Sequence, residues 1–502
     1  MTVLGLSGAK RNACAAISVD GEIRAACEQE RLTRVRGVGL VPWGIPAEAV
    51  REVIGLSRVL SEDVSTHVLS EAEVRLPAGL PTRTVDHHRA HAATAFLTSP
   101  FERAAVVVCD SQSERELSVW IGDGDRVDDL NWPWRGRAFA SLYTECADLF
   151  APASASSAHE MEVLAHRGRG DQVERLRNVF RLGDDGLEVD HRWHEHVAAM
   201  IADEGRAPGH AAETAHAVQR HIGDLLLDFL RAVRAVAGTD ALCLAGGLFY
   251  NTYFTTLVRV SGIFDRTFVP INPGNAGLCV GAALMLDREN GGGASRAAVS
   301  PFLGPEYDSE SIKATLDGCK LSYEFVSDNN AIDAAVAALG RGELVAWFQG
   351  RMEWGHRALG HRSILADARS PYVLDNLNFF LRKRDRSRPF GMAVCDDAVP
   401  KLFCGPSASP FMEYEYRPRD DRFRHVLPPG ATSIRVQTVP PDAGPFWRLL
   451  KTVEQATGTG ALVNTSFNGF HEPIVCTPRD AIRVFFGTGL DMLVIGRFIL
   501  RK

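Results

Sequence analysis

The sequence lacks a long apolar run, closely paired cysteines and any segment typical of a secretion signal. Its apolar stretches are interrupted by charged residues or glycine well short of the about 20 residues that span a membrane. Ten cysteines are scattered without a C-x-x-C pair, and several lie in apolar runs such as VVVCD, which favours buried, reduced thiols. Met1–Ser7 leads into a strand-like segment without a preceding basic stretch. We therefore expect a protein of the reducing cytoplasm with no membrane partner.

An excess of charge of one sign is also missing. The formal net charge is −7 over 502 residues, and it is spread along the chain rather than concentrated in a tail. This balance argues against a nucleic acid or an anionic membrane as the main partner, and it makes a small molecule the expected one. Apolar residues make up 45% and charged residues 23% of the chain, as in an ordinary globular protein.

The length predicts two large domains, because a chain of 502 residues exceeds what one hydrophobic core holds. The clearest linker is Asp287–Ser300 (DRENGGGASRAAVS), which is polar and rich in glycine. We therefore expect domains at residues 1–290 and 306–502.

The N-terminal domain contains one pattern twice. TVLGLSG and ACAAISVDGEIRAACEQERLTR predict three short strands, with Asp20-Gly21 as a hairpin turn. AAVVVCDSQSERELSVWIGDGDRV repeats the order of buried strand, polar loop, strand and turn. The duplication resembles the core of actin and the sugar kinases, in which two units face each other and each offers a loop to a phosphate. The fold class predicted is α/β (α+β in part), with a duplicated actin/hexokinase-like N-terminal domain.

Further elements follow from periodicity. Ala211–Val236 has the apolar spacing of a helix, and Ala241–Ala245 is a short buried strand. Ala331–Leu339 predicts a helix that ends at Gly340. GELVAWFQGRMEWG reads as a strand that enters a loop, and DMLVIGRFILRK as one final strand.

Two histidines and an aspartate form a candidate metal site. His87 and His91 are four residues apart at the start of a predicted helix, so their imidazoles project from one face. Asp110 follows the strand VVVCD and offers a carboxylate as the third ligand. Surface or capping histidines are the common alternative for such a pair, but the carboxylate at the strand end favours a metal.

Two glycine-bearing loops indicate a nucleotide site. Gly246 and Gly247 close a buried strand before a helix, which lets backbone N–H groups approach a phosphate or ribose, and Asn251 follows one helical turn later. Pro273–Gly277 is a second loop of this kind. A tight turn explains either loop alone, whereas the pair favours a nucleotide cleft.

The C-terminal domain is rich in arginine. A solvated basic face is the usual explanation of such a run, but these arginines alternate with Gly, Leu and Phe. Planar guanidinium groups bind phosphate and carboxylate-like anions in a bidentate manner, which favours an anion pocket. The arginines are Arg351, Arg357, Arg362, Arg382, Arg384, Arg386 and Arg388.

These motifs together resemble the O-carbamoyltransferases of the nodulation-factor and cephalosporin type, over nearly the whole chain. The stretches that carry the resemblance are EQERLTR (28–34), DHHRAHAATAF (86–96), LAGGLFYN, GNAGLCVGAAL, FQGRMEWGHRALGHRSILADAR, RSRPF and VNTSFNGFHEPIVCTPRDA.

The resemblance implies a two-stage reaction. The C-terminal domain, similar to the YrdC-type threonylcarbamoyl-adenylate synthases, would make carbamoyl-adenylate from carbamoyl phosphate and ATP, with Mg²⁺. The N-terminal domain would bind this adenylate at a divalent metal and pass the carbamoyl group to a hydroxyl of a small secondary metabolite. Two imidazoles and a carboxylate do not distinguish Fe, Zn, Mn and Co. A homodimer is a further implication of the resemblance.

The resemblance also assigns roles to residues. His87, His91 and Asp110 would hold the metal. The expected catalytic residues are Arg351, Arg357, Arg388 and Ser466. The expected substrate- and nucleotide-binding residues are Gly246, Gly247, Asn251, Asn275, Arg362, Arg382, Arg384, Asn464 and Asn468.

The sequence departs from the family pattern at four places. Arg11 and Asn12 replace a His-Asp pair, Asn275 stands where the family has a metal-binding Asp, and Ser156–Gly168 replaces a Lys-x-Met-Gly segment. The loop after the strand VVVCD reads SQSERE instead of a glycine-rich segment, with Glu114 at the expected offset. The alternatives are therefore N-carbamoylation or another ATP-dependent ligation on the same scaffold, and a non-catalytic homologue.

Overall fold

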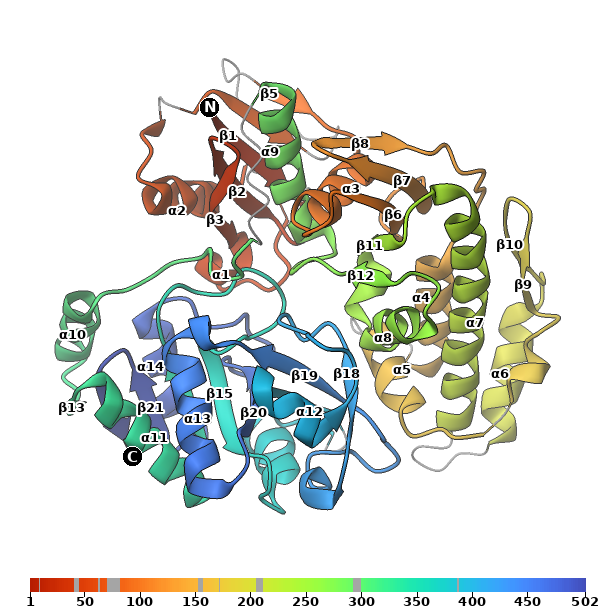
Figure 1. Ribbon diagram of the computed structural model, residues 1–502. Coiled ribbons are helices and arrows are strands. Elements are labelled where there is room, and N and C mark those ends of the chain that lie inside the picture. Colours follow the sequence, from red (N-terminus) through yellow and green to blue (C-terminus); the bar gives the residue numbers. More distant parts are fainter. Residues whose placement is uncertain are drawn as a thin grey trace.

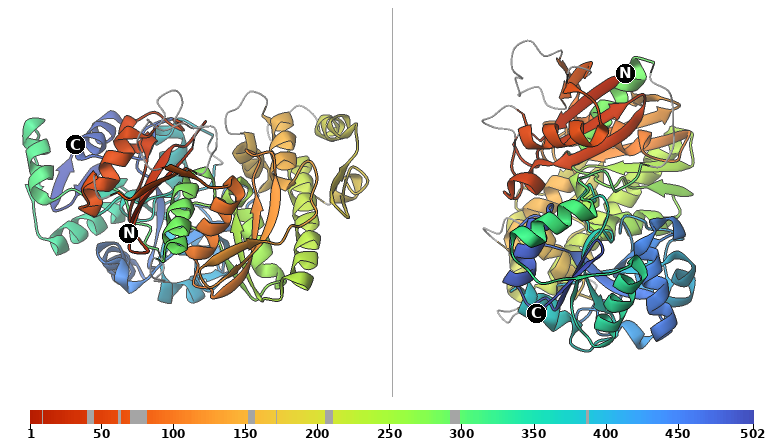
Figure 2. Two further views of the ribbon diagram at one scale, coloured as in Figure 1. Left: turned by 90° about the horizontal axis from the view of Figure 1, so that it is seen from above. Right: turned by 90° about the vertical axis from the view of Figure 1, so that its left-hand side faces the viewer.

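The N-terminal and C-terminal halves of the chain build separate sheets in the computed structural model, and the two halves lie against each other (Figure 1). The structure describes residues 1–8, 10–39, 45–61, 64–69, 82–151, 157–170, 172–204, 211–291, 299–385 and 388–502. Half of the predicted linker, residues 292–298, lies outside this part of the chain, so the domain limits stay a prediction. Figure 2 shows the first sheet and the C-terminal half one above the other when the molecule is viewed from its left side.

The first sheet has the order β3-β2-β1-β4-β5. Strands β1, β2 and β3 pair antiparallel, and β4 and β5 add in parallel beyond β1. The predicted turn between β2 and β3 is confirmed, with Asp20 at φ 51° and Gly21 at φ 86°. The strands are β1 Thr2–Ser7, β2 Cys14–Val19, β3 Glu22–Glu28, β4 Thr66–Leu69 and β5 Thr82–Thr84.

The second sheet repeats this connectivity with the order β12-β11-β6-β7-β8. Its first three strands are again antiparallel, and two parallel strands again join beyond the first. The predicted duplication and the α/β class are thereby confirmed. The strands are β6 Arg103–Cys109, β7 Leu117–Asp123, β8 Arg126–Asp129, β11 Ala241–Ala245 and β12 Arg266–Phe268.

Two helices join the sheets by crossing between them. Helix α3 (His87–Leu97) follows the first sheet and packs on β6 and β11 of the second, while α9 (Leu278–Glu289) follows the second sheet and packs on β1 and β2 of the first. The helices touch at Gly281, where a Cβ atom would lie 2.1 Å from the carbonyl oxygen of Ala90. This contact therefore requires a glycine.

The remaining N-terminal elements surround these sheets. Helix α7 confirms the long helix predicted from periodicity, and β11 has the predicted bounds. The elements are α1 Gln29–Thr33, α2 Ala47–Ser57, α4 Phe139–Phe150, α5 Ser157–Ala165, β9 Phe180–Gly183, β10 Gly186–Val189, α6 Trp193–Asp203, α7 Ala212–Ala237 and α8 Thr252–Ser261.

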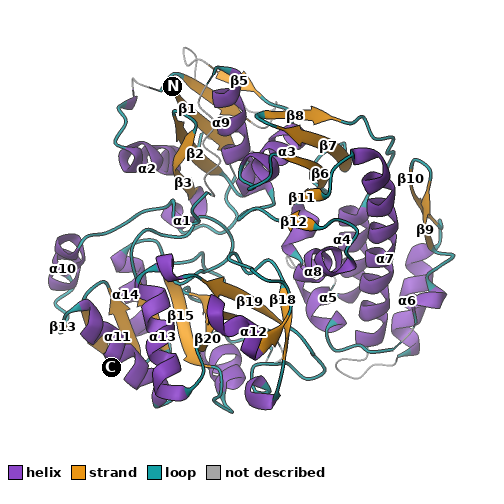
Figure 3. Ribbon diagram, in the orientation of Figure 1, coloured by secondary structure: helices purple, strands orange, loops and turns teal. Residues whose placement is uncertain are grey.

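The C-terminal half forms one ten-stranded sheet of order β13-β22-β21-β14-β15-β20-β16-β19-β18-β17. Helices α11 and α13 pack on it and lie in front of its strands in Figure 3. The strands are β13 Glu324–Phe325, β14 Val345–Phe348, β15 Arg362–Asp367, β16 Gly391–Cys395, β17 Phe403–Cys404, β18 Glu415–Pro418, β19 Ile434–Val439, β20 Ala461–Ser466, β21 Met492–Ile495 and β22 Phe498–Arg501. The helices are α10 Ser309–Gly318, α11 Asp328–Gly340, α12 Val399–Leu402, α13 Pro445–Thr457 and α14 Pro478–Gly487, with a π-helical turn at Asp375–Leu381.

One element differs from its prediction. DMLVIGRFILRK forms two antiparallel strands, β21 and β22, instead of one. Gly496 adopts φ 55° between them, and this left-handed conformation reverses the chain. Among the described residues, no helix combines the length and apolarity needed to cross a membrane.

The glycine at the helix crossing makes a test of this packing. We expect Gly281→Ala to lower the free energy of unfolding by about 1–3 kcal/mol, because the added methyl group overlaps the Ala90 carbonyl. The matched control is Gly55→Ala in α2, where no atom lies within 4 Å of the new Cβ. That change should raise the free energy of unfolding by about 0.5–1 kcal/mol. Urea denaturation measures both, and equal effects would contradict the assigned packing.

Candidate active site

The candidate metal ligands meet at the ends of two adjoining elements. His87 and His91 lie one turn apart on α3, with ring centroids 4.9 Å from each other. Asp110 follows β6 and accepts a hydrogen bond of 3.1 Å from Nε2 of His87. The donor atoms of the three residues lie within 4.8 Å of one another. The structure thus brings the predicted triad together.

The surroundings of His91 and Asp110 keep the imidazole neutral and the carboxylate ionised, as binding of a cation requires. Desolvation lowers the pKa of His91 to about 4, against the opposing charge of Asp110 and contacts with Asn275 and the Pro273 carbonyl. Burial alone would raise the pKa of Asp110, but the hydrogen bond from His87 and the two nearby imidazoles hold it at about 2. His91 is 1% exposed, and its Nε2 has no hydrogen-bond partner among the described residues. Neutral imidazole and ionised carboxylate donors, one of them orphaned, fit a divalent cation.

The histidine between the two ligands serves a different purpose. The ring nitrogens of His88 contact the hydroxyl groups of Ser118 at 2.6 Å and Ser113 at 2.9 Å. Burial lowers its pKa to about 3. His88 therefore holds the strand and loop beside the candidate metal site without adding a ligand.

The first glycine loop lies directly beside Asp110. Because β6 and β11 are parallel and register Val108 with Ala245, Asp110 and Gly246 emerge at the same edge of the sheet. Gly246 has φ 102°, and a Cβ there would lie 2.1 Å from the Cys109 carbonyl oxygen. A Cβ on Gly247 would lie 3.6 Å from a carboxylate oxygen of Asp110. Both glycines keep the backbone close to the triad.

Asn251 is engaged within the N-terminal half. Its Oδ1 accepts from the backbone N–H of Tyr253 at 2.9 Å and so caps α8. Its Nδ2 donates to the Tyr143 hydroxyl and to Gln219, each at 3.0 Å. The predicted contact of Asn251 with a nucleotide stays a prediction, and Asn275 lies half-buried against His91.

The two halves meet between the glycine loop and the C-terminal segment GHRALGH. Arg357 donates to the backbone carbonyl of Tyr250 at 3.2 Å. The ring of His356 packs edge-on against the Tyr250 ring, with centroids 4.4 Å apart. Tyr250 thus connects the surroundings of Asp110 to the arginine-rich half. Sequence reasoning passed over Tyr250 because it looked only for polar ligands in this loop.

Five arginines form an arginine cluster beside this contact: Arg357, Arg382, Arg384, Arg388 and Arg435. Burial, together with the charges of Arg382, Arg388 and Arg435, lowers the pKa of Arg384 to about 9. Burial and the charge of Arg435 likewise lower the pKa of Arg357 to about 9. A bound anion would offset this destabilisation of the charged forms of Arg384 and Arg357.

Two predicted phosphate ligands lie elsewhere. Arg362 is 0% exposed, stacks 3.6 Å from the centroid of Phe348, and donates to the carbonyls of Gln349 and Pro305 at 2.7 and 3.1 Å. Arg351 donates to the carbonyls of Leu303 and Gly304 at 2.7 and 3.2 Å. Both anchor the chain after the linker. Their predicted role as phosphate ligands stays a prediction, and Arg386 lies outside the described residues.

Arg435 was missed by sequence reasoning. It occupies the buried strand β19, IRVQTV, where its NH1 lies 3.7 Å from a carboxylate oxygen of Glu162. A charged residue inside an otherwise apolar strand is the signal that could have identified it.

The NTSFN loop is tied to the arginine cluster through Arg382. This guanidinium donates to the Asn468 carbonyl at 2.7 Å and to its side chain at 2.8 Å, and it also contacts the Ser466 carbonyl. The Ser466 hydroxyl donates to Asn468 Oδ1 at 2.6 Å. Asn464 donates to Ala358 and Gln437, and its buried Oδ1 has no partner within the described ranges.

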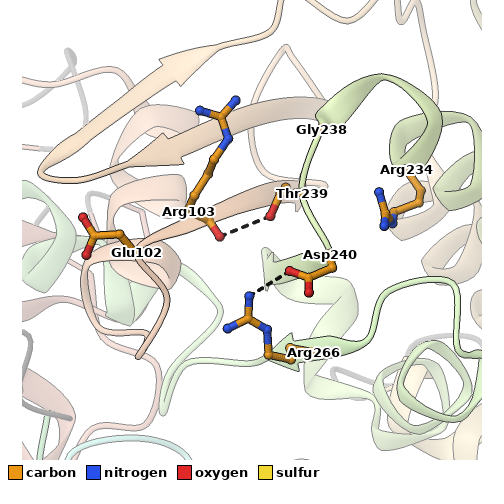
Figure 4. Close-up of a pocket in the computed structure, with 7 residues that line it drawn as sticks. All are labelled: Glu102, Arg103, Arg234, Gly238, Thr239, Asp240 and Arg266. Carbon is orange, nitrogen blue, oxygen red and sulfur yellow. Dashed lines mark hydrogen bonds and ion pairs between the residues drawn. The ribbon is translucent and has the colours of Figure 1, made fainter.

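A second arginine-rich hollow lies far from this site. It has a volume of about 440 Å³ and is lined by Arg103, Arg234, Arg266, Asp240 and others (Figure 4). Arg103 begins β6, the strand that ends beside Asp110, so the two places are about 20 Å apart. Arg266 pairs with Asp240 at 2.7 Å, and Arg103 pairs with Asp123. Two of the three arginines of this hollow are therefore already paired with carboxylates.

Comparison with known proteins places the chain in a family. The family described as "Carbamoyltransferase N-terminus" matches residues 66–284, and "Carbamoyltransferase C-terminus" matches residues 336–502. The chain belongs to the carbamoyltransferase family. The predicted recognition and the assignment as a carbamoyltransferase enzyme are confirmed.

Similar proteins come from several organisms. Nodulation protein NolO of Bradyrhizobium diazoefficiens is 30% identical over 83% of this chain and 79% of its own. The uncharacterized protein sll1178 of Synechocystis is 28% identical over 100% of this chain and 96% of its own. Among solved structures, full-length HypF in a phosphate- and nucleotide-bound form has a TM-score of 0.41 and 13% identity, over 58% of this chain and 56% of its own.

Metal binding by the triad can be measured directly. We expect the metal-free protein to bind one Mn²⁺, Zn²⁺, Fe²⁺ or Co²⁺ ion per chain. Loss of a residue that contacts a metal ligand, but not the metal, weakens metal affinity by roughly 10–100-fold. His91→Ala removes a direct ligand and should therefore weaken binding by more than this. Asn275→Asp should strengthen it, because a carboxylate adds charge beside the cation. Calorimetry measures these affinities. His88→Gln is the matched control on the same helix, and an equal loss in that variant would contradict the assigned ligand set.

Proposed function

We propose that this carbamoyltransferase makes carbamoyl-adenylate from carbamoyl phosphate and ATP in its C-terminal half. Its N-terminal half then passes the carbamoyl group to a hydroxyl of a small secondary metabolite. The observation that carries the proposal is the arginine cluster, in which burial and neighbouring guanidinium charges lower the pKa of Arg384 and Arg357 beside the contact between the halves.

The arginine cluster suits the activation step. Carbamoyl phosphate and ATP together bring several phosphate charges to one place. Pre-positioned guanidinium groups stabilise such charge as it moves during phosphoryl and acyl transfer. In a chain of net charge −7, five arginines at one place favour an anionic occupant, because its charge would offset part of their repulsion.

The triad and the glycine loop suit the transfer step. A divalent cation held by His87, His91 and Asp110 would supply Lewis-acid stabilisation of a carbamoyl or phosphate oxygen. Gly246 and Gly247 leave the backbone beside Asp110 open to close approach by the adenylate.

The contact between the halves supports direct passage of the intermediate. Gly355 donates its N–H to Glu28 at 2.8 Å, and Arg31 donates to the Gly355 carbonyl at 2.9 Å. These bonds fix the segment that carries Arg357 against the N-terminal half, and Arg357 itself reaches Tyr250. A reactive mixed anhydride formed at the arginines would then reach the triad across this contact between the halves.

The activation step gives a direct test. With carbamoyl phosphate, ATP and Mg²⁺, we expect pyrophosphate release that requires carbamoyl phosphate. Arg384→Ala and Arg388→Ala should each lower the rate by about 10²–10³-fold, because each removes one pre-positioned donor. Arg231→Ala, an exposed arginine of α7 paired with Asp228, is the matched control and should retain the rate. Pyrophosphate release without carbamoyl phosphate, or none at all, would overturn the proposal.

A further inference from the structure

Helix α5 separates the glycine loop from the arginine cluster. The Tyr143 hydroxyl, which also contacts Asn251, donates to the carbonyl of Ala158 near the start of α5 at 3.4 Å. One turn further along α5, a carboxylate oxygen of Glu162 lies 3.7 Å from the guanidinium of Arg435 in β19. Residues between Ala158 and Glu162 therefore border both halves of the proposed reaction path. Ser156, which begins the divergent segment, lies outside the described residues.

His159 of α5 is fixed through one ring nitrogen only. Its Nδ1 donates to Glu162 Oε2 at 3.0 Å. The Glu162 side chain is 8% exposed, whereas that of His159 is 36% exposed. Nε2 has no hydrogen-bond partner in the described part of the chain. A buried carboxylate on Nδ1 and a free Nε2 form the arrangement that orients an imidazole as a base.

Glu162 is itself held in place and ionised. Burial would raise its pKa, but the hydrogen bond from His159 and the charges of His159 and Arg435 hold it at about 2. Its neighbour His166 uses both ring nitrogens, on the Glu162 carbonyl at 2.7 Å and on Glu415 at 3.1 Å. His166 is thus a structural link between the halves, and His159 differs from it in keeping one nitrogen free.

The other histidines near the path are poorer bases. His87 and His91 belong to the candidate metal site, and His88 is bonded to two serines. His356 is accessible, but the charged side chains that act on it are Arg357, Arg435 and Arg31. An imidazolium at His356 would form among like charges, whereas one at His159 would form against the Glu162 carboxylate.

We propose that His159, oriented by Glu162, is the base that activates the acceptor hydroxyl; this inference rests on the proposed function. Nε2 takes the hydroxyl proton as the acceptor oxygen forms a bond to the carbamoyl carbon. The bond between that carbon and the AMP phosphate oxygen breaks, and AMP leaves with the electron pair. The imidazolium then returns its proton to solvent. Glu162 is a positioning residue, and His159 is the catalytic one.

The protonation state of His159 agrees with this role. Desolvation lowers its pKa, and the charges of Arg435 and Arg388 act in the same direction, against the raising effect of Glu162. The folded pKa therefore lies below the ordinary value of about 6.5. The ring is neutral at neutral pH, so transfer should hold its rate down to about pH 6.5 and decline only below it.

Two rates measured on the same full-length protein separate transfer from activation. Pyrophosphate release from ATP and carbamoyl phosphate reports activation. AMP release with glycerol at molar concentration, or with water where glycerol does not react, reports transfer. His159→Gln should lower AMP release by about 10²–10⁴-fold, with pyrophosphate release much less affected. Imidazole added to His159→Ala should restore part of the loss. His191→Gln, an exposed histidine, is the matched control.

The positioning role of Glu162 has its own readout. Glu162→Gln should lower the plateau rate of AMP release and move its acid limb to lower pH, because the imidazolium loses its carboxylate. Glu162→Asp should recover part of the rate, and thermal unfolding shows whether either variant is folded.

Other results would overturn the inference. These are a parental AMP-release rate in His159→Gln, an equal loss of both rates, or the transfer-specific loss appearing in His356→Gln instead. A parent protein that releases no pyrophosphate would count against the proposed activation step itself. That outcome is distinguishable, because the inference alone fails only when pyrophosphate release is intact.

Discussion

The arrangement of the site depends on one buried contact, in which Glu28 and Arg31 hold the backbone of Gly355 from both sides. Burial raises the pKa of Glu28, and the neighbouring charge of Arg31 opposes that rise. Such a pair is costly to break, because loss of one partner leaves a buried charge uncompensated. The motif EQERLTR therefore acts as a clamp: Arg34 adds bonds to the carbonyls of Pro473 and Ile474, at 2.7 and 2.6 Å. The clamp determines where Arg357 lies, two residues beyond Gly355.

With the position of Arg357 fixed, the arginines of the C-terminal half lie opposite carboxylates of the N-terminal half. Glu162 lies 3.7 Å from Arg435, and Glu160 lies 3.4 Å from Arg388. Both carboxylates belong to α5, so one short helix partly neutralises the arginine cluster while no anion is bound. Exposed pairs of this kind contribute little, whereas the buried pair of Glu162 and Arg435 experiences weaker screening. Arg384 is stacked 4.8 Å from the centroid of Phe390 and donates to Asn378, and no carboxylate of the described residues pairs with it, which leaves it the more available to a phosphate.

The sequence predicted those features that follow directly from the spacing of residues along the chain. Alternation and turn residues gave the duplicated strand order, and a separation of four residues put His87 and His91 on one helix face. The position of Asp110 at the end of a strand likewise allowed its place beside the two histidines to be predicted. The sequence did not predict the backbone contacts of Arg351 and Arg362, because an arginine in an apolar segment satisfies its donors on backbone carbonyls as readily as on an anion. Arg435 was missed because its partner Glu162 is distant in sequence. His159 was missed although Glu162 follows three residues later, because only the fold brings Arg435 and Arg388 towards it.

The divergent segment around α5 carries the charged groups that lie between the two halves. A helix that carries Glu160 and Glu162 towards arginines and His159 towards the open side serves both halves at once. Binding of a phosphate at the cluster would compete with Glu160 for Arg388, and the more deeply buried Glu162 would keep its hold on His159 and Arg435. The anion and the imidazole therefore share one wall of the site without sharing a ligand. In the proposed mechanism, activation and transfer then proceed at neighbouring positions, because the arginine charges that activation requires also lower the pKa of His159 and leave it unprotonated for transfer.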